Sequence, residues 1–142
     1  MGSRMFILTM RPKLSRIPSP CKTTAEDERE QGSARRLYRA LDVGAGIGRV
    51  TADVLLYLFD QIDLVEPVSA FIESGKHNAT SGKWSSSLRA DKALRFWNTS
   101  IQAFLPSLAP SNPSATPLSS SIVGPEHGWN DGSGYDVIWA QW

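Results

Sequence analysis

Short, continuous apolar runs alternate with helical stripes along residues 37–140. The runs predict four strands, at residues 37–43, 62–65, 93–98 and 135–140. Apolar residues at consecutive positions are typical of parallel strands that are covered on both faces. Because helical segments separate these strands, the pattern predicts an α/β fold with right-handed crossovers between parallel strands.

Two helices are predicted between the first three strands. The first, at residues 47–59, has an apolar stripe formed by Ile47, Val50, Val54, Leu55 and Leu58. Pro67 ends the second strand, and Ser69 is suitably placed to cap a second helix that runs to about Ala79. The polar segment at residues 80–87 is expected to be a loop.

The N-terminal segment and the stretch before the fourth strand are both polar, and the first of them separates an N-terminal part from the main domain. Residues 3–10 predict a basic N-terminal helix that Pro12 stops, and residues 12–34 read as a flexible linker. Ser, Pro, Gly and Asn dominate the stretch from Phe104 to Gly134, which is too long and too polar for a structured connection. We therefore expect a helix and linker over residues 1–38. A domain over residues 39–142 follows, with a disordered insertion at about 106–134.

Composition narrows the class of protein only slightly. The 142 residues allow one modest domain, and the formal net charge of +1 gives no overall basic field of the kind nucleic-acid binders carry. One cysteine excludes an internal disulfide framework and fits a reducing compartment. No apolar run approaches the roughly 18 residues of a membrane span. The expected location is the cytoplasm, with the nucleus as a further site; a basic N-terminal helix is preferred over a transit peptide.

The most informative chemistry lies where the first strand ends. The sequence RALDVGAGIGR places Gly44, Gly46 and Gly48 between the end of a strand and the start of a helix. Glycine adopts the backbone angles of such a reversal at low cost, and its small size lets a ligand approach the backbone. Glu66 ends the second strand, where an acid can accept the hydroxyls of a ribose. Asp91 is a rival acid, but it precedes the third strand.

The spacing of the glycines distinguishes two ligands. A dinucleotide-binding loop follows G-x-G-x-x-G, whereas this loop follows G-x-G-x-G and has Asp42 before it. The tighter loop suits a zwitterion, with an ammonium near Asp42 or the loop carbonyls and a carboxylate near Arg49. Cations are unfavourable at a helix N-terminus, so Arg49 is expected to have a specific partner. S-adenosylmethionine has both an amino-acid end and a ribose, whereas NAD is disfavoured.

Four segments together resemble one family. The sequences ALDVGAGIGRVT, LFDQIDLVEPVSAFIE, SIQAF and YDVIWAQW are similar to those of the eukaryotic α-N-terminal protein methyltransferases. The resemblance covers about residues 39–142, and GSRMFILTM resembles the helix that precedes the family's core. It implies a Rossmann-like class I methyltransferase fold, here a partial parallel sheet whose first four strands have the spatial order 3-2-1-4. It also implies S-adenosyl-L-methionine as cofactor and, as substrates, proteins whose N-termini begin X-Pro-Lys.

The resemblance also assigns roles to single residues. It implies that Gly44, Gly46, Arg49 and Glu66 bind the cofactor, with Arg49 on the carboxylate. The resemblance places four further site residues after the third and fourth strands. Ile101 and Gln102 would flank the adenine, Gln141 would face the sulfonium, and Trp142 would line the peptide channel. No metal ligands are expected, because His77 and His127 lack partners at metal-binding spacing.

The resemblance implies that some functional residues are absent. The family has a histidine soon after QW and an aspartate further on, and neither matches a residue of this sequence. No catalytic residue is therefore identified in this chain, and it is expected to be an incomplete copy, truncated at both ends. The alternative is a non-catalytic fragment that binds the cofactor; an NAD-dependent oxidoreductase is less favoured. Apolar side chains on the fourth strand would leave an exposed edge open to self-association.

Overall fold

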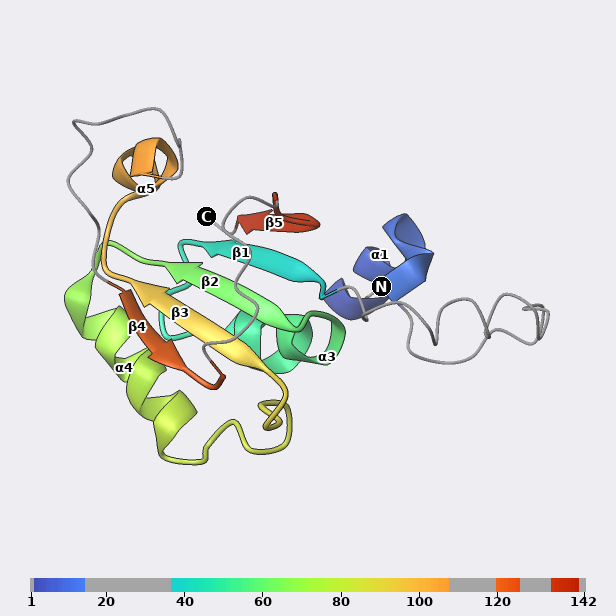
Figure 1. The fold of residues 1–142 in the computed structure, drawn as a ribbon, viewed down its shortest axis with the longest axis horizontal. Coiled ribbons are helices and arrows are strands. Elements are labelled where there is room, and N and C mark those ends of the chain that lie inside the picture. Colours follow the sequence, from blue (N-terminus) through green and yellow to red (C-terminus); the bar gives the residue numbers. More distant parts are fainter. Residues whose placement is uncertain (1, 15–36, 108–119, 126–133, 141–142) are drawn as a thin grey trace.

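The computed structural model describes residues 2–14, 37–107, 120–125 and 134–140 (Figure 1). Its centre is a five-stranded sheet with the spatial order β4-β3-β2-β1-β5. The strands are β1 (Arg39–Val43), β2 (Gln61–Val65), β3 (Ala93–Trp97), β4 (Ser120–Val123) and β5 (Val137–Ala140).

Four of these strands form the predicted parallel sheet. β1 pairs in parallel with β2 on one side and with β5 on the other, and β2 pairs in parallel with β3. Numbered as the sequence predicted them, the four strands have the order 3-2-1-4, so the predicted fold class and strand order are confirmed. β1 and β5 each begin two residues later than predicted, β3 ends one residue earlier, and β2 begins one residue earlier.

β4 corrects the expectation of an unstructured insertion. Ser120–Val123 pairs antiparallel with β3 and forms one edge of the sheet. Its sequence is a short run of serine, isoleucine and valine that is too brief to give a strand signal, so the strand depends on the template that β3 offers. The other parts of the predicted insertion, residues 108–119 and 126–133, lie outside the described residues, as do the linker residues 15–36.

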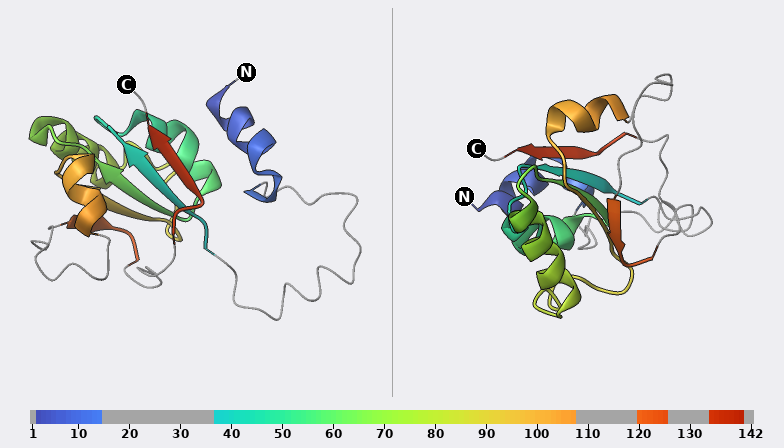
Figure 2. Two further views of the ribbon diagram at one scale, coloured as in Figure 1. Left: turned by 90° about the horizontal axis from the view of Figure 1, so that it is seen from above. Right: turned by 90° about the vertical axis from the view of Figure 1, so that its left-hand side faces the viewer.

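The helices cover both faces of the sheet. α1 (Ser3–Met10), the π-helix η2 (Thr51–Leu55), α3 (Leu56–Leu58) and α4 (Ser69–Thr80) lie on one face, and α5 (Ile101–Ser107) lies on the other (Figure 2). The predicted helix at 3–10 has the same bounds as α1, which a short 3-10 turn, η1 (Pro12–Leu14), follows. The predicted helix at 47–59 begins two residues later, at Arg49, because Gly48 still belongs to the turn.

Side chains alternate between the two faces, and this alternation builds the core. Ile62 and Leu64 of β2 pack under η2, α3 and α4, while Val65 packs with Phe104 of α5. On the α5 face, Asp63 is fully buried and accepts hydrogen bonds from a set of surrounding donors, namely Arg39, Arg95, Trp97 and Tyr135. Buried charges need such partners, so β2 carries a polar residue inside an otherwise apolar run.

Among the described residues, no helix is long and apolar enough to cross a bilayer.

Candidate functional site

The carboxyl ends of the parallel strands lie at one edge of the sheet. Val43 is the register partner of Val65 and of Ala140, and Val65 is the partner of Trp97. The segments that follow these residues therefore start from the same row. In open α/β sheets, ligands bind beyond this edge, where the chain leaves the strands.

The glycine loop connects β1 to the first helical turn. Gly44, Gly46 and Gly48 all have positive φ, at 67°, 57° and 80°, which favours glycine at each position. A Cβ on Gly48 would overlap the indole ring of Trp84, whereas a Cβ on Gly46 would meet no atom within 4 Å. The two glycines thus differ in their roles: Gly48 lets the loop pack on Trp84, and Gly46 borders open space.

Glu66 connects the loop to the next strand. One carboxylate oxygen, Oε2, accepts the N–H of Gly46 at 2.9 Å, and the other, Oε1, accepts the N–H of Val68 at 2.9 Å. The residue is 6% exposed and directly follows β2, as the sequence predicted. Each oxygen has a further lone pair, so the carboxylate can still accept a hydroxyl while it holds the loop.

The loop's own amides largely bond within the protein. The N–H groups of Gly44 and Ala45 donate to Val65 O, and that of Gly48 donates to Ala45 O. In this respect the loop differs from a phosphate-binding loop, in which the backbone N–H groups donate to the anion. The positive charge at the site comes instead from Arg49 and from the N-terminal end of the helix that it begins.

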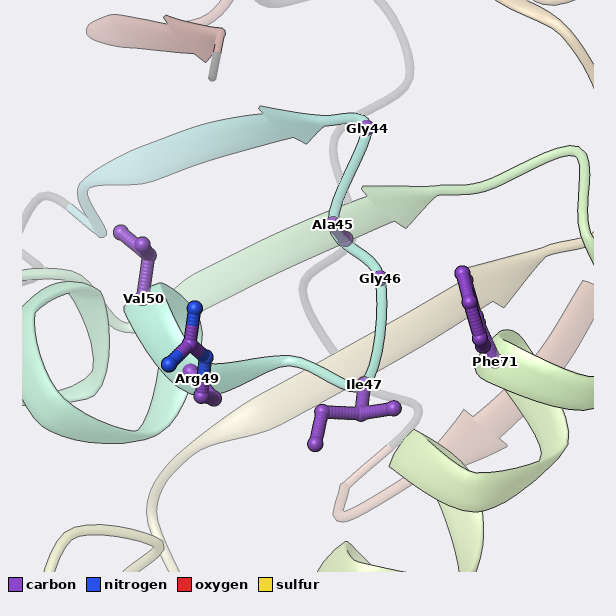
Figure 3. Close-up of a pocket in the computed structure, with 7 residues that line it drawn as sticks. All are labelled: Gly44, Ala45, Gly46, Ile47, Arg49, Val50 and Phe71. Atoms are coloured by element: carbon purple, nitrogen blue, oxygen red, sulfur yellow. The ribbon is translucent and has the colours of Figure 1, made fainter. Parts of the chain in front are cut away.

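A pocket of about 260 Å³ lies against this loop (Figure 3). It is lined by Gly44, Ala45, Gly46, Ile47, Arg49, Val50 and Phe71. Arg49 and Phe71 lie on opposite sides of the loop in Figure 3. Arg49 is exposed and makes no ion pair with another described residue, so its guanidinium is available to an anionic ligand. The partner that the sequence predicted for Arg49 is therefore not a described protein side chain.

Asp42 does not line the pocket, which corrects one expectation about the ammonium. It is 1% exposed, and its Oδ2 accepts the hydroxyl of Thr51 at 2.6 Å. Burial raises the pKa of Asp42 to about 6, although the hydrogen bonds from the Thr51 side chain and backbone oppose this rise. Asp42 therefore stabilises the start of η2 through its hydrogen bond with Thr51. Of the two groups predicted for the ammonium, only the loop carbonyls remain.

The other predicted site residues lie at the same edge or outside the described structure. Ile101 is half-buried at the start of α5, next to the cluster around Phe104, and Gln102 is exposed beside it. Neither lines the pocket. Gln141 and Trp142 lie outside the described residues. The rival acid Asp91 is exposed and pairs with Arg89, away from the strand ends.

Sequence reasoning missed three residues around the site. Phe71 lines the pocket from α4 and is 49% exposed, which is high for a phenylalanine. Gly75 lets α4 approach the loop, since a Cβ there would lie 3.3 Å from Ile47 O. Asn98, just after β3, hydrogen-bonds to the turn that carries Glu66. The sequence held a signal for Phe71 alone, as a large apolar residue two positions after Ser69, the predicted N-cap of the second helix.

Ser69 corrects a prediction about capping. The N-cap of α4 is Val68, without a side-chain hydrogen bond, and the hydroxyl of Ser69 donates to Asn98 Oδ1 at 2.9 Å. The serine thus stabilises the β2–α4 turn by joining it to β3 and leaves the helix amides alone.

Comparison with known proteins places this arrangement in a family. A family model described as AdoMet dependent proline di-methyltransferase matches residues 23–142. Alpha N-terminal protein methyltransferase 1 of Oryza sativa subsp. indica is 38% identical over 111 residues, which are 78% of this chain and 28% of the rice protein. N-terminal Xaa-Pro-Lys N-methyltransferase 1-B of Xenopus laevis is 30% identical over 72% of this chain and 32% of its own length.

One solved structure is similar over a shorter stretch. It is a SAM-dependent methyltransferase of Leishmania major, 37% identical, with a TM-score of 0.30, and the match covers 39% of this chain and 23% of the other. The chain spans less than a third of the curated relatives named above. The matched residues include the glycine loop, Glu66 and all five strands. This chain belongs to the family of AdoMet-dependent proline di-methyltransferases.

Proposed function

We propose that this chain binds S-adenosylmethionine at the glycine loop and supplies the cofactor-binding part of an enzyme that methylates protein α-amino groups. One observation supports the proposal above the others. The carboxylate of Glu66 accepts the N–H of Gly46 in the middle of the glycine loop, and the exposed Arg49 follows the loop and lines the pocket that lies against it. Glu66 is not among the residues that line this pocket. An acid for ribose hydroxyls and a cation for a carboxylate match the ribose and the amino-acid end of this cofactor.

The residues present fit the cofactor. Open space in front of Gly46 would receive the ligand next to the backbone, and any larger side chain there would fill it. Arg49 would bind the carboxylate, Glu66 would accept the ribose hydroxyls, and Phe71 would close the pocket on the α4 side. Ile101, Gln102 and Gln141 remain proposed contacts to the adenine and the methionine end. Trp142 remains a proposed wall for the peptide.

The chemistry is a direct transfer of a methyl group to an amine. When bound, the cofactor supplies an activated methyl group on a sulfonium, which is a good leaving group. The chain's residues orient that group and exclude water from it. An N-terminal amine has a pKa of about 8, so its proton must be removed before attack. None of the seven residues that line the pocket has a side chain that acts as a base at neutral pH.

This lining favours a second candidate function, a cofactor-binding module without catalytic activity. The two candidates differ in transfer, not in binding. Incubation of the chain with cofactor labelled in the methyl group and a peptide beginning Ser-Pro-Lys or Pro-Pro-Lys distinguishes them. Labelled peptide establishes a complete enzyme, whereas cofactor binding without label establishes the module. Absence of cofactor binding overturns both.

Binding itself is tested by calorimetry on the chain and two variants. Arg49→Ala is expected to weaken S-adenosylmethionine binding roughly ten- to a hundredfold, because it removes a charge-assisted hydrogen bond of about 1.5–3 kcal/mol. The variant should keep its fold, since Arg49 holds no described protein partner. Unchanged affinity in Arg49→Ala would remove this residue from the site.

The second variant, Gly46→Val, is expected to abolish binding by filling the pocket. Its matched control is Gly82→Val: Gly82 also has a positive φ, 83°, and a Cβ there also meets nothing within 4 Å, but Gly82 does not line the pocket. Both variants place a side chain at a position with positive φ, but only the one at Gly46 enters the space of the pocket. Equal loss of binding in both would argue against a ligand at Gly46. Tighter binding of NAD than of S-adenosylmethionine would favour the oxidoreductase.

A further inference from the structure

The turn between β2 and α4 is held by one side chain from the neighbouring strand. Asn98 follows β3, and its amide Nδ2 donates to Glu66 O at 3.0 Å and to Pro67 O at 3.1 Å. Its other amide atom, Oδ1, accepts the hydroxyl of Ser69 at 2.9 Å. Three polar groups of the turn are thus held by one residue that sequence reasoning assigned no role.

The same turn carries Glu66, the acid proposed above for the ribose hydroxyls. The Glu66 carboxylate holds the amides of Gly46 and Val68, so its position sets both the glycine loop and the start of α4. The backbone of Glu66 is held from β3 by two bonds, one from Asn98 to its carbonyl and one from its own N–H to Trp97 O at 3.1 Å. A chain of contacts therefore leads from β3 through Glu66 to the loop.

We propose that Asn98 is a positioning residue for cofactor binding, which fixes Glu66 so that its carboxylate meets the ribose hydroxyls. The inference rests on the proposed function, because it assumes that Glu66 contacts the cofactor. Pre-organisation of this kind contributes to affinity by removing the cost of ordering the turn when the ligand binds. All three hydrogen bonds of Asn98 are made by its side-chain amide. A replacement must therefore have both a donor and an acceptor at the same distance from the backbone.

The first arm of the test uses the chain without cofactor. Exchange of the Gly46 and Val68 amide hydrogens, followed by NMR, reports whether the Glu66 carboxylate is held. We expect Asn98→Ala to speed exchange at both amides roughly five- to tenfold, as the loss of one to two surface hydrogen bonds implies. Asn78→Ala is the matched control, since Asn78 lies on α4 and its side chain has no described hydrogen bond.

The second arm measures affinities for S-adenosylmethionine and its 2′-deoxy analogue. In the wild-type chain the ratio of the two dissociation constants reports the contact between Glu66 and the ribose. We expect Asn98→Ala to bind S-adenosylmethionine roughly five- to tenfold more weakly and to discriminate less between the two ligands. General destabilisation would weaken both ligands alike. Asn98→Asp, which cannot donate to the two carbonyls, should behave like Asn98→Ala.

The outcomes separate this inference from the proposed function. If the wild-type chain does not bind S-adenosylmethionine, the proposed function fails, and the exchange arm still tests the hold on Glu66. If the wild-type chain binds and Asn98→Ala keeps both its exchange rates and its affinity ratio, the positioning role of Asn98 is overturned. Faster exchange with an unchanged ratio also overturns it, because the hold would then be structural only.

Discussion

At the scale of single residues, Asp42 has the environment with the clearest consequence. Its carboxyl is buried beneath the glycine loop, and burial raises its pKa from 3.8 to about 6. The folded state therefore binds this proton more tightly than the unfolded chain does. The contribution of Asp42 to stability is most favourable below about pH 4 and declines as the pH rises through about 6.

Asp42→Asn tests this contribution. Between about pH 4 and pH 7, the variant is expected to gain stability relative to wild type by up to about 3 kcal/mol, since a pKa unit corresponds to about 1.4 kcal/mol. Urea unfolding at several pH values measures the difference. Asp53→Asn is the control, because Asp53 is exposed on η2, the helix that carries Thr51, and this variant should show no such trend. A constant difference between Asp42→Asn and wild type across this range would contradict the raised pKa.

At the scale of elements, α1 is held by few contacts. Ile7 is its one buried residue and packs into the main core, while Met5, Phe6 and Met10 are all more than half exposed. Arg4 adds a hydrogen bond to Asp53 O at 2.8 Å and lies 4.0 Å from the centre of the Tyr57 ring. The docking of this helix therefore depends mainly on Ile7, with the partly buried Leu8 and the cation of Arg4 as further contacts.

Ile7→Ala is expected to release α1 while the sheet stays folded. A large-to-small change in a core costs about 2–5 kcal/mol when the structure stays in place. Here the loss is limited, because the helix can detach instead. Hydrogen exchange followed by mass spectrometry should show lost protection in α1 and retained protection in β1 and β2. Met5→Ala, at a residue 60% exposed, is the control. Equal loss of protection in helix and sheet would contradict an independently docked α1.

At the scale of the whole molecule, the two edges of the sheet differ. β4 pairs antiparallel with β3 and β5 pairs in parallel with β1, and neither edge strand has a second partner among the described residues. Ile138 on β5 is 62% exposed. A parallel edge strand with an exposed apolar residue favours pairing with another chain.

Ile138→Lys is expected to reduce self-association of the chain. Sedimentation velocity over a range of concentrations measures it: the wild type should form dimers or larger species, and the variant should remain monomeric. Ile122→Lys makes the same change on β4, where the isoleucine is 39% exposed, and should leave association unchanged. A wild-type chain that stays monomeric at high concentration, or an effect of Ile122→Lys alone, would contradict an interface at β5.

The sequence by itself determined the elements and their order. Mainly apolar runs predicted β1, β2, β3 and β5, because a parallel strand that is covered on both faces is rich in apolar residues. The glycine spacing marked the loop because few residues adopt positive φ there. Glu66 was recognised because it ends a strand beside that loop. These signals are local, since each depends on residues close together in the chain.

Only the tertiary structure decided which residues meet. β4 forms because β3 presents an open edge, and nothing in its own four residues predicts this pairing. Asp42 proved to be buried beneath the helix, and Gly48 is required by Trp84, 36 positions away in the chain. Asn98 contacts Glu66 across 32 positions. Hydrogen bonding and packing between distant segments leave no periodic trace in a sequence, so their partners emerge only when the strands align.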